Sequence, residues 1–124
     1  MLHPVQAAVG TKYLVVDDHP RTRHALIEAL SRPGDTFHEA ASGEEALTLY
    51  EATLPDWVIM DVRMPGLDGL ATTTRIVARH PEARVLLVSQ FDDEELTRQA
   101  RESGARGFLS KDAIADLRSL LEQL

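Results

Sequence analysis

Four short apolar runs, each ending in polar side chains, constrain the fold of this chain more than any other feature. The apolar residues are consecutive rather than alternating, which is typical of parallel strands covered on both faces. The carboxyl ends of parallel strands meet at one edge of a sheet, so the polar side chains are expected to gather there. The runs are 13–16 before Asp17 and Asp18, 57–60 before Asp61, 85–88 before Ser89, and 107–109 before Ser110 and Lys111.

Helix-like segments alternate with the strands and carry recognisable end signals. Pro20 fits the first turn of a helix, Ser42 and Glu45 form a capping box, and Gly104 ends a helix as a left-handed residue. The pattern predicts an α/β fold: a single doubly wound, five-stranded parallel sheet with five helices and right-handed crossovers. The expected strands are about 12–16, 36–40 (an edge strand), 57–61, 85–88 and 107–109, and the expected helices about 20–32, 42–54, 70–79, 93–103 and 112–124.

The last two helices differ in their apolar content. Asp92 or Asp93 can cap the fourth, whose only apolar residues between positions 94 and 103 are Leu96 and Ala100. This helix is therefore predicted to be the least firmly held and a candidate moving part. Asp112 is expected to cap the final helix, which has apolar residues at helical spacing at positions 114, 117, 120, 121 and 124.

Length and composition indicate one ordinary soluble domain. With 124 residues, positions 1–11 are expected to form a flexible N-terminal leader and 12–124 the folded unit. Neither a signal peptide nor a transmembrane run is read, so a cytoplasmic location without membrane contact is expected. The net charge of −7 argues against direct nucleic-acid binding, and the absence of cysteine excludes disulfides, thiolate catalysis and a cysteine-based zinc site.

The expected edge of the sheet combines three carboxylates with an ammonium and a hydroxyl. Asp17, Asp18 and Asp61 cannot all stay ionised close together unless a cation lies among them or their pKa values rise. An all-oxygen site of this kind suits Mg²⁺, with Mn²⁺ as a substitute. A carboxylate can also attack phosphorus, and Lys111 and Ser89 could neutralise the developing charge. Asp61 is the expected nucleophile because it ends the central strand.

The chain resembles the receiver domain of bacterial response regulators. The resemblance rests on Asp17-Asp18, on Asp61 with the turn 64–69, and on Ser89 and Lys111. It implies a flavodoxin- or CheY-like sheet in the order 2-1-3-4-5. It also implies that a sensor histidine kinase phosphorylates Asp61, and that Lys111 pairs with the phosphoryl group.

Further roles follow from the same resemblance. Mg²⁺ would be held by Asp18, Asp61 and the main-chain oxygen of Arg63, with Asp17 acting through water. Ser89 would move to hydrogen-bond the phosphoryl group, and Phe108 occupies the position of a rotating aromatic switch, although it lacks a hydroxyl. Residues 104–112 are similar to the NarL/LuxR-type subfamily, which implies transcription regulation through a helix-turn-helix output domain outside this chain.

Several alternatives stay open beside this interpretation. The chain could be a stand-alone receiver, a non-phosphorylated scaffold, or a phosphatase of the haloacid dehalogenase type. The phosphatase is disfavoured because Arg63 stands where such enzymes need a second aspartate, and the main interpretation is not an enzyme in the usual sense. A homodimer is possible through either face of the sheet. The five histidines share no ligand spacing and are read as surface or satisfied residues: His3, His19, His24, His38 and His80.

Overall fold

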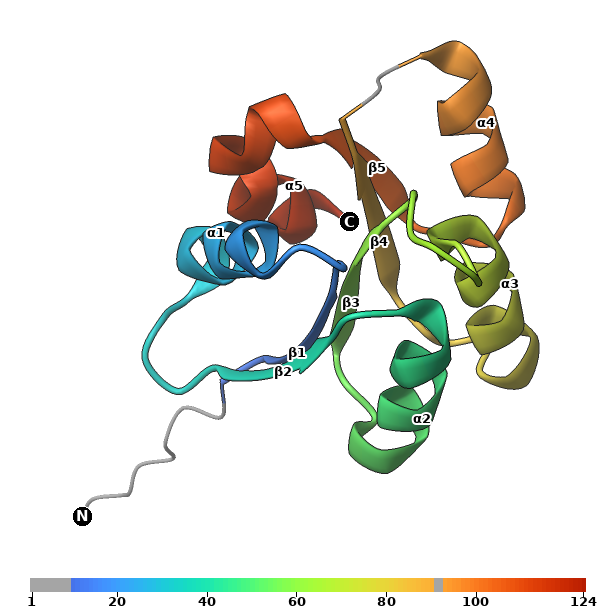
Figure 1. Cartoon of the computed structure of the whole chain (residues 1–124). Coiled ribbons are helices and arrows are strands. Elements are labelled where there is room, and N and C mark those ends of the chain that lie inside the picture. The colour runs from blue at the N-terminus through green and yellow to red at the C-terminus, as the bar shows by residue number, and fades with distance from the viewer. Residues whose placement is uncertain (1–9, 91–92) are drawn as a thin grey trace.

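The computed structural model describes residues 10–90 and 93–124. The proposed leader at 1–11 lies mostly outside these residues, as does the alternative helix cap Asp92. The elements, labelled in Figure 1, are β1 Lys12–Val16, α1 Pro20–Leu30, β2 Thr36–Ala40, α2 Gly43–Thr53, β3 Trp57–Asp61, α3 Gly69–Arg79, β4 Val85–Ser89, α4 Glu94–Glu102, β5 Gly107–Ser110, the 3₁₀ helix η1 Lys111–Asp116, and α5 Leu117–Gln123.

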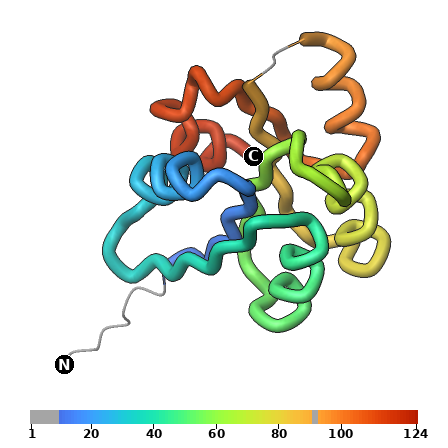
Figure 2. The backbone as a smooth tube through the Cα atoms, in the orientation of Figure 1, coloured from blue at the N-terminus to red at the C-terminus, as the bar shows by residue number. Residues whose placement is uncertain are grey.

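The five strands form one parallel sheet in the order β2-β1-β3-β4-β5, with β2 at one edge. The predicted fold class and strand order are therefore confirmed. Helices α1 and α5 cover one face and α2, α3 and α4 cover the other (Figure 1). The backbone in Figure 2 leaves β1, β3, β4 and β5 at the same edge of the sheet, as parallel strands require.

The consecutive apolar residues of the strands fill two cores, one on each face of the sheet. Leu14 and Val16 of β1 belong to the core under α2, α3 and α4, whereas Tyr13 and Val15 belong to the core under α1 and α5. Every residue of β3 and β4 is buried. Burial on both faces explains why these strands have no polar alternation.

Side-chain caps set where several helices begin. Ser42 Oγ accepts the Glu45 N–H at 3.1 Å, while the Glu45 carboxylate accepts the N–H of Ala41 rather than that of Ser42. Asp93 caps α4 by accepting the Leu96 N–H at 2.7 Å. Asp68 caps α3 by accepting the Ala71 N–H at 2.8 Å, a cap that the sequence analysis did not identify. Gly104 has φ 101°, as predicted for a left-handed residue after a helix.

The prediction for the final helix was wrong at its start. Ser110, not Asp112, provides the cap: its hydroxyl accepts the Asp112 N–H at 3.2 Å. Residues 111–116 form a 3₁₀ segment with a non-helical Ala113, and the α-helix begins only at Leu117. A 3₁₀ turn is tighter than an α-helical turn, so it lets the chain reverse directly after β5. Leu124, expected on the apolar stripe, is 44% exposed and lies one residue past the end of α5.

Among residues 10–90 and 93–124, no helix has both the length and the apolar character needed to span a bilayer.

Candidate functional site

The strand register gathers the predicted polar residues at the carboxyl edge of the sheet. Val16 of β1 pairs with Met60 of β3, so Asp17 and Asp61 follow at the same level. Asp61 pairs with Val88, and Ser89 pairs with Ser110, which places Lys111 one residue beyond Ser89. The predicted convergence of the strand ends is therefore observed.

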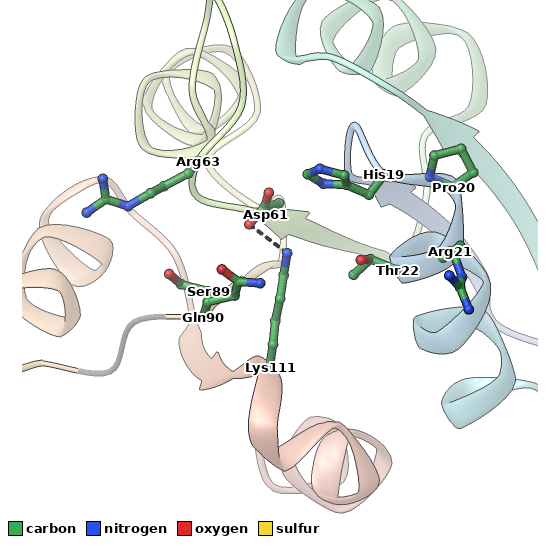
Figure 3. Close-up of a pocket in the computed structure, with 9 residues that line it drawn as sticks. All are labelled: His19, Pro20, Arg21, Thr22, Asp61, Arg63, Ser89, Gln90 and Lys111. Carbon is green, nitrogen blue, oxygen red and sulfur yellow. Dashed lines mark ion pairs between the residues drawn. The ribbon is translucent and has the colours of Figure 1, made fainter.

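Lys111 bridges two buried carboxylates at the centre of this edge. Its Nζ atom lies 3.0 Å from Asp17 Oδ2 and 3.2 Å from Asp61 Oδ1. The side chains of Asp17, Asp61 and Lys111 are 0%, 6% and 13% exposed, so these charges are largely removed from water. Figure 3 shows Lys111 reaching from the start of η1 toward Asp61. The pair of Lys111 and Asp17 links residues that are 94 positions apart in the sequence.

The close packing of these charges shifts their pKa values. Burial and the negative charge of Asp17 raise the pKa of Asp61, and Lys111 and the Arg63 main-chain N–H oppose this only in part. Burial by itself lowers the pKa of Lys111, but its hydrogen bond to Asp17 and the neighbouring carboxylate charges outweigh burial and raise this pKa. Lys111 is therefore held as a cation, whereas further positive charge nearby would favour the ionised form of Asp61.

Asp18 supplies the oxygen best suited to a cation. Its Oδ1 atom is buried and receives no hydrogen bond from residues 10–90 and 93–124. By contrast, both oxygens of Asp17 have donors: the His19 N–H at 2.9 Å from Oδ1 and Lys111 at Oδ2. A buried carboxylate oxygen without a donor is costly, and a hard divalent cation would satisfy it. The residues present therefore fit a site for Mg²⁺ or Mn²⁺.

A cavity of about 450 Å³ opens above Asp61, and Figure 3 shows the residues around it. Ser89, which is 1% exposed, and Gln90 line it from the end of β4. Arg63 lines it too, with its side chain directed away from Asp61 in Figure 3. The main-chain oxygen of Arg63 as a metal ligand stays a prediction. The other lining residues are His19, Pro20, Arg21, Thr22 and Lys111.

The turn after Asp61 is held by a close approach of two backbone segments. The Gly69 N–H donates to Val62 O at 2.8 Å, and a Cβ atom at Gly69 would lie only 2.1 Å from Asp61 O. Gly66 has φ 75°, a conformation that glycine adopts without strain. The close backbone approach and the positive φ explain why the turn between β3 and α3 has glycine at positions 69 and 66.

Phe108 lies on β5, away from the cavity above Asp61. It is partly buried and packs against the core under α2, α3 and α4. A small separate cavity at Phe108 is lined also by Thr97 and Ala100 of α4 and by Ala105. Phe108 therefore lies on the side of β5 that is covered by α4, the helix predicted to be weakly held. Its role as a switch stays a prediction.

His19 is the member of the site that the sequence analysis missed. Its Nδ1 atom lies 3.2 Å from Asp18 Oδ1 and 3.4 Å from Asp17 Oδ1. This histidine has no partner at a ligand spacing along a helix. Its position directly after Asp17-Asp18 at a strand end was the available signal, because neighbouring residues in a turn can direct side chains to one point.

The fold and the site together define the class of this protein. It is an α/β domain with an acidic pocket at the carboxyl edge of a five-stranded parallel sheet. Residues 13–123 match the family described as "Response regulator receiver domain". The chain belongs to this family, and the resemblance stated from the sequence is confirmed.

Two relatives and one solved structure place the chain within the family. It is 49% identical over 104 residues to the transcriptional activator protein ExaE of Pseudomonas putida, and 40% identical over 104 residues to the transcriptional regulatory protein NarL of Mycobacterium tuberculosis. These alignments cover 81% and 82% of this chain but 48% of each relative, so the chain spans about half their length. The solved receiver domain of the latter NarL matches with a TM-score of 0.84 at 35% identity, covering 94% of this chain and 96% of that one. The relatives are thus NarL/LuxR-type regulators.

Proposed function

We propose that this domain accepts a phosphoryl group on Asp61 and passes the signal on by a change of conformation. The observation that carries the proposal is the geometry of Asp61 itself: a nearly buried carboxylate at a cavity, 3.2 Å from Lys111, whose ammonium group also pairs with Asp17, in a chain of the receiver family. The proposed donor is a phosphohistidine of a sensor histidine kinase.

In the proposed reaction, an oxygen of ionised Asp61 attacks phosphorus, forming an acyl phosphate as the bond from phosphorus to the imidazole nitrogen breaks. Lys111 stabilises charge on the transferred group and favours the ionised form of Asp61. Ser89, which lines the same cavity, moves to hydrogen-bond a phosphoryl oxygen. When bound, Mg²⁺ supplies charge neutralisation at the phosphoryl oxygens. Asp18, Asp61 and the Arg63 main-chain oxygen would hold it, with Asp17 contributing through water.

The proposed signal runs from Ser89 through Phe108 to α4. Ser89 is paired with Ser110 in the sheet, and Phe108 lies two residues before Ser110. Displacement of Ser89 toward Asp61 would let the Phe108 ring turn inward. Helix α4 has only Leu96 and Ala100 buried, so a change of volume at Phe108 can repack it at small cost. The added dianionic group biases an equilibrium between two packings.

We further propose that residues 12–124 are the regulatory part of a longer transcription regulator. The support is that the relatives named above are transcription regulators of about twice this length. DNA contact would then come only from an output domain, while this domain meets a histidine kinase and, in a homodimer, a second copy. Such a domain works by stoichiometric phosphorylation rather than as a turnover enzyme. A cytoplasmic location remains our prediction.

Intact mass spectrometry after incubation with acetyl phosphate tests the phosphoryl transfer. The wild-type chain with Mg²⁺ should gain one phosphoryl group. The adduct should be absent from Asp61→Asn and from the wild type in excess EDTA. Asp56→Asn is the matched control, since Asp56 lies at the opposite end of β3, and it should gain the group as the wild type does. No adduct on a folded wild-type protein would refute the proposal and favour the scaffold alternative.

A further inference from the structure

We propose that His19 is a metal-selectivity residue of the acidic pocket, whose ring nitrogen joins Asp18 as a ligand to favour divalent transition metals over Mg²⁺. The inference rests on the proposed function, because it concerns the ion that would assist phosphorylation of Asp61. It goes further by assigning a ligand that is neither a carboxylate nor a main-chain oxygen. Borderline metal ions such as Co²⁺ are the chemical class that such a ligand recognises.

The spacing of the three side chains is the first argument. His19 Nδ1 lies 3.2 Å from Asp18 Oδ1 and 3.4 Å from Asp17 Oδ1, and one ligand atom from each residue lies within 4.8 Å of the other two. Neighbouring ligands of an octahedral ion with bonds of about 2.1 Å are about 3.0 Å apart. The His19 nitrogen and the Asp18 oxygen are therefore close to the separation that a shared ion requires, and Asp17 is near enough to act through water.

The second argument is the state of the Asp18 oxygen. Within the part of the chain that the structure describes, Asp18 Oδ1 is buried and accepts no hydrogen bond, even though His19 Nδ1 is its neighbour. A simple histidine–carboxylate pair would place a ring N–H on that oxygen. An ion between the two atoms would instead satisfy the buried oxygen and use the lone pair of the nitrogen.

The backbone explains why the His19 ring is held at this place. His19 is the residue before α1, with extended φ −104° and ψ 114°, and its side chain does not cap the helix. Its main-chain N–H donates to Asp17 Oδ1 at 2.9 Å, which fixes the residue against the acidic cluster. The side chain is 70% exposed, and Figure 3 shows the ring on the side of the cavity that faces Asp61. A hydrated ion can thus reach the ring without repacking of the core.

The chemical type of the ligand atom decides which ions bind more tightly. Mg²⁺ binds oxygen and keeps several waters, so an imidazole nitrogen adds little to its affinity. Imidazole suits the later first-row metals, for which affinity rises in the order Mn²⁺, Fe²⁺, Co²⁺, Ni²⁺. His19 should therefore strengthen Co²⁺ binding while leaving Mg²⁺ binding nearly unchanged.

Isothermal titration calorimetry of the whole chain with Mg²⁺ and, separately, Co²⁺ tests this assignment. We expect His19→Asn to change the Mg²⁺ dissociation constant by less than about twofold and to weaken Co²⁺ by about tenfold or more. The visible absorption of bound Co²⁺ should shift as well, because a nitrogen ligand is lost. His24→Asn is the matched control: His24 is exposed on α1 but outside the cluster, and its variant should bind both ions like the wild type.

Three outcomes separate this inference from the proposed function. Equal Co²⁺ affinity in wild type and His19→Asn overturns the inference, and the proposed function stands if Asp18→Asn still abolishes Mg²⁺ binding. Equal weakening of both ions in His19→Asn also overturns it, since His19 would then support the pocket without selecting the metal. Failure of the folded wild type to bind either ion would contradict the proposed metal-dependent function itself.

Discussion

Replacing Lys111 by methionine should destabilise the fold through the two carboxylates that it leaves behind. Methionine keeps most of the side-chain volume, so the main loss is the positive charge between Asp17 and Asp61. Breaking a buried ion pair costs about 3–5 kcal/mol, because the remaining charge stays in a poorly solvated site. The carboxylates of Asp17 and Asp61 are 0% and 6% exposed, but the cavity at Asp61 and Lys111 can admit water, so we expect the lower end, about 3 kcal/mol.

Urea denaturation at neutral pH in EDTA, followed by circular dichroism, measures this loss. With a slope of about 1–3 kcal/mol per molar urea, the midpoint should fall by about 1–3 M. Lys12→Met is a suitable control because Lys12 is the only other lysine in the sequence. Lys12 Nζ donates to Thr53 O at 2.8 Å, and losing this hydrogen bond should cost about 1 kcal/mol.

Two additions make the charge argument stricter. Adding Asp61→Asn to Lys111→Met should recover part of the lost stability, because one uncompensated carboxylate is removed. Saturating Mg²⁺ should stabilise Lys111→Met more than the wild type, since a bound cation replaces the missing charge. The reasoning is refuted if Lys111→Met loses no more stability than Lys12→Met, or if Asp61→Asn makes the variant less stable still.

Two further predictions follow from the turn after β3 and from the surface of α2. Gly69→Ala should cost about 2 kcal/mol and reduce the acetyl phosphate adduct, because its Cβ atom would meet Asp61 O at 2.1 Å; an unchanged urea midpoint would contradict this close approach. The hydrogen bond from His80 lowers the pKa of Glu51, so the stability that Glu51 contributes is present above its unfolded pKa and lost as pH falls through its lower folded pKa. The free energy of unfolding should therefore fall less between neutral and acid pH in Glu51→Gln than in the wild type. Parallel curves for the two proteins would contradict a stabilising hydrogen bond between Glu51 and His80.

The sequence predicted the elements of the fold well because the signals were local. Consecutive apolar residues such as Val85 to Val88 have no polar face to place toward water, which leaves a doubly covered parallel strand as the stable solution. Ser42 and Asp93 cap the helices that follow them, as expected from their own hydrogen-bonding chemistry. The end of each apolar run also marks the end of a strand. The sequence therefore predicts the edge of the sheet at which the acidic residues meet.

Local signals were insufficient where a neighbouring element changed the outcome. Thr72 and Thr73 of α3 are fully buried, although threonine is usually a surface residue. Helix α2 approaches so closely that a Cβ atom at Gly43 would lie 2.3 Å from Thr72 Oγ1, and only small side chains fit there. Similarly, the sequence predicted a regular final helix, but Ser110 takes the cap and the chain turns through a 3₁₀ segment before α5.

The amino-acid sequence by itself therefore determined the order of strands and helices, the receiver resemblance and the identity of the polar residues at the strand ends. Only the tertiary structure decided how these residues are paired: Lys111 between Asp17 and Asp61, His19 beside Asp18, and the Asp18 oxygen without a donor. The physical reason is that a strand or a cap depends on interactions between residues a few positions apart. Pairing and burial depend instead on the distances and solvent exposure that arise only when distant segments pack together.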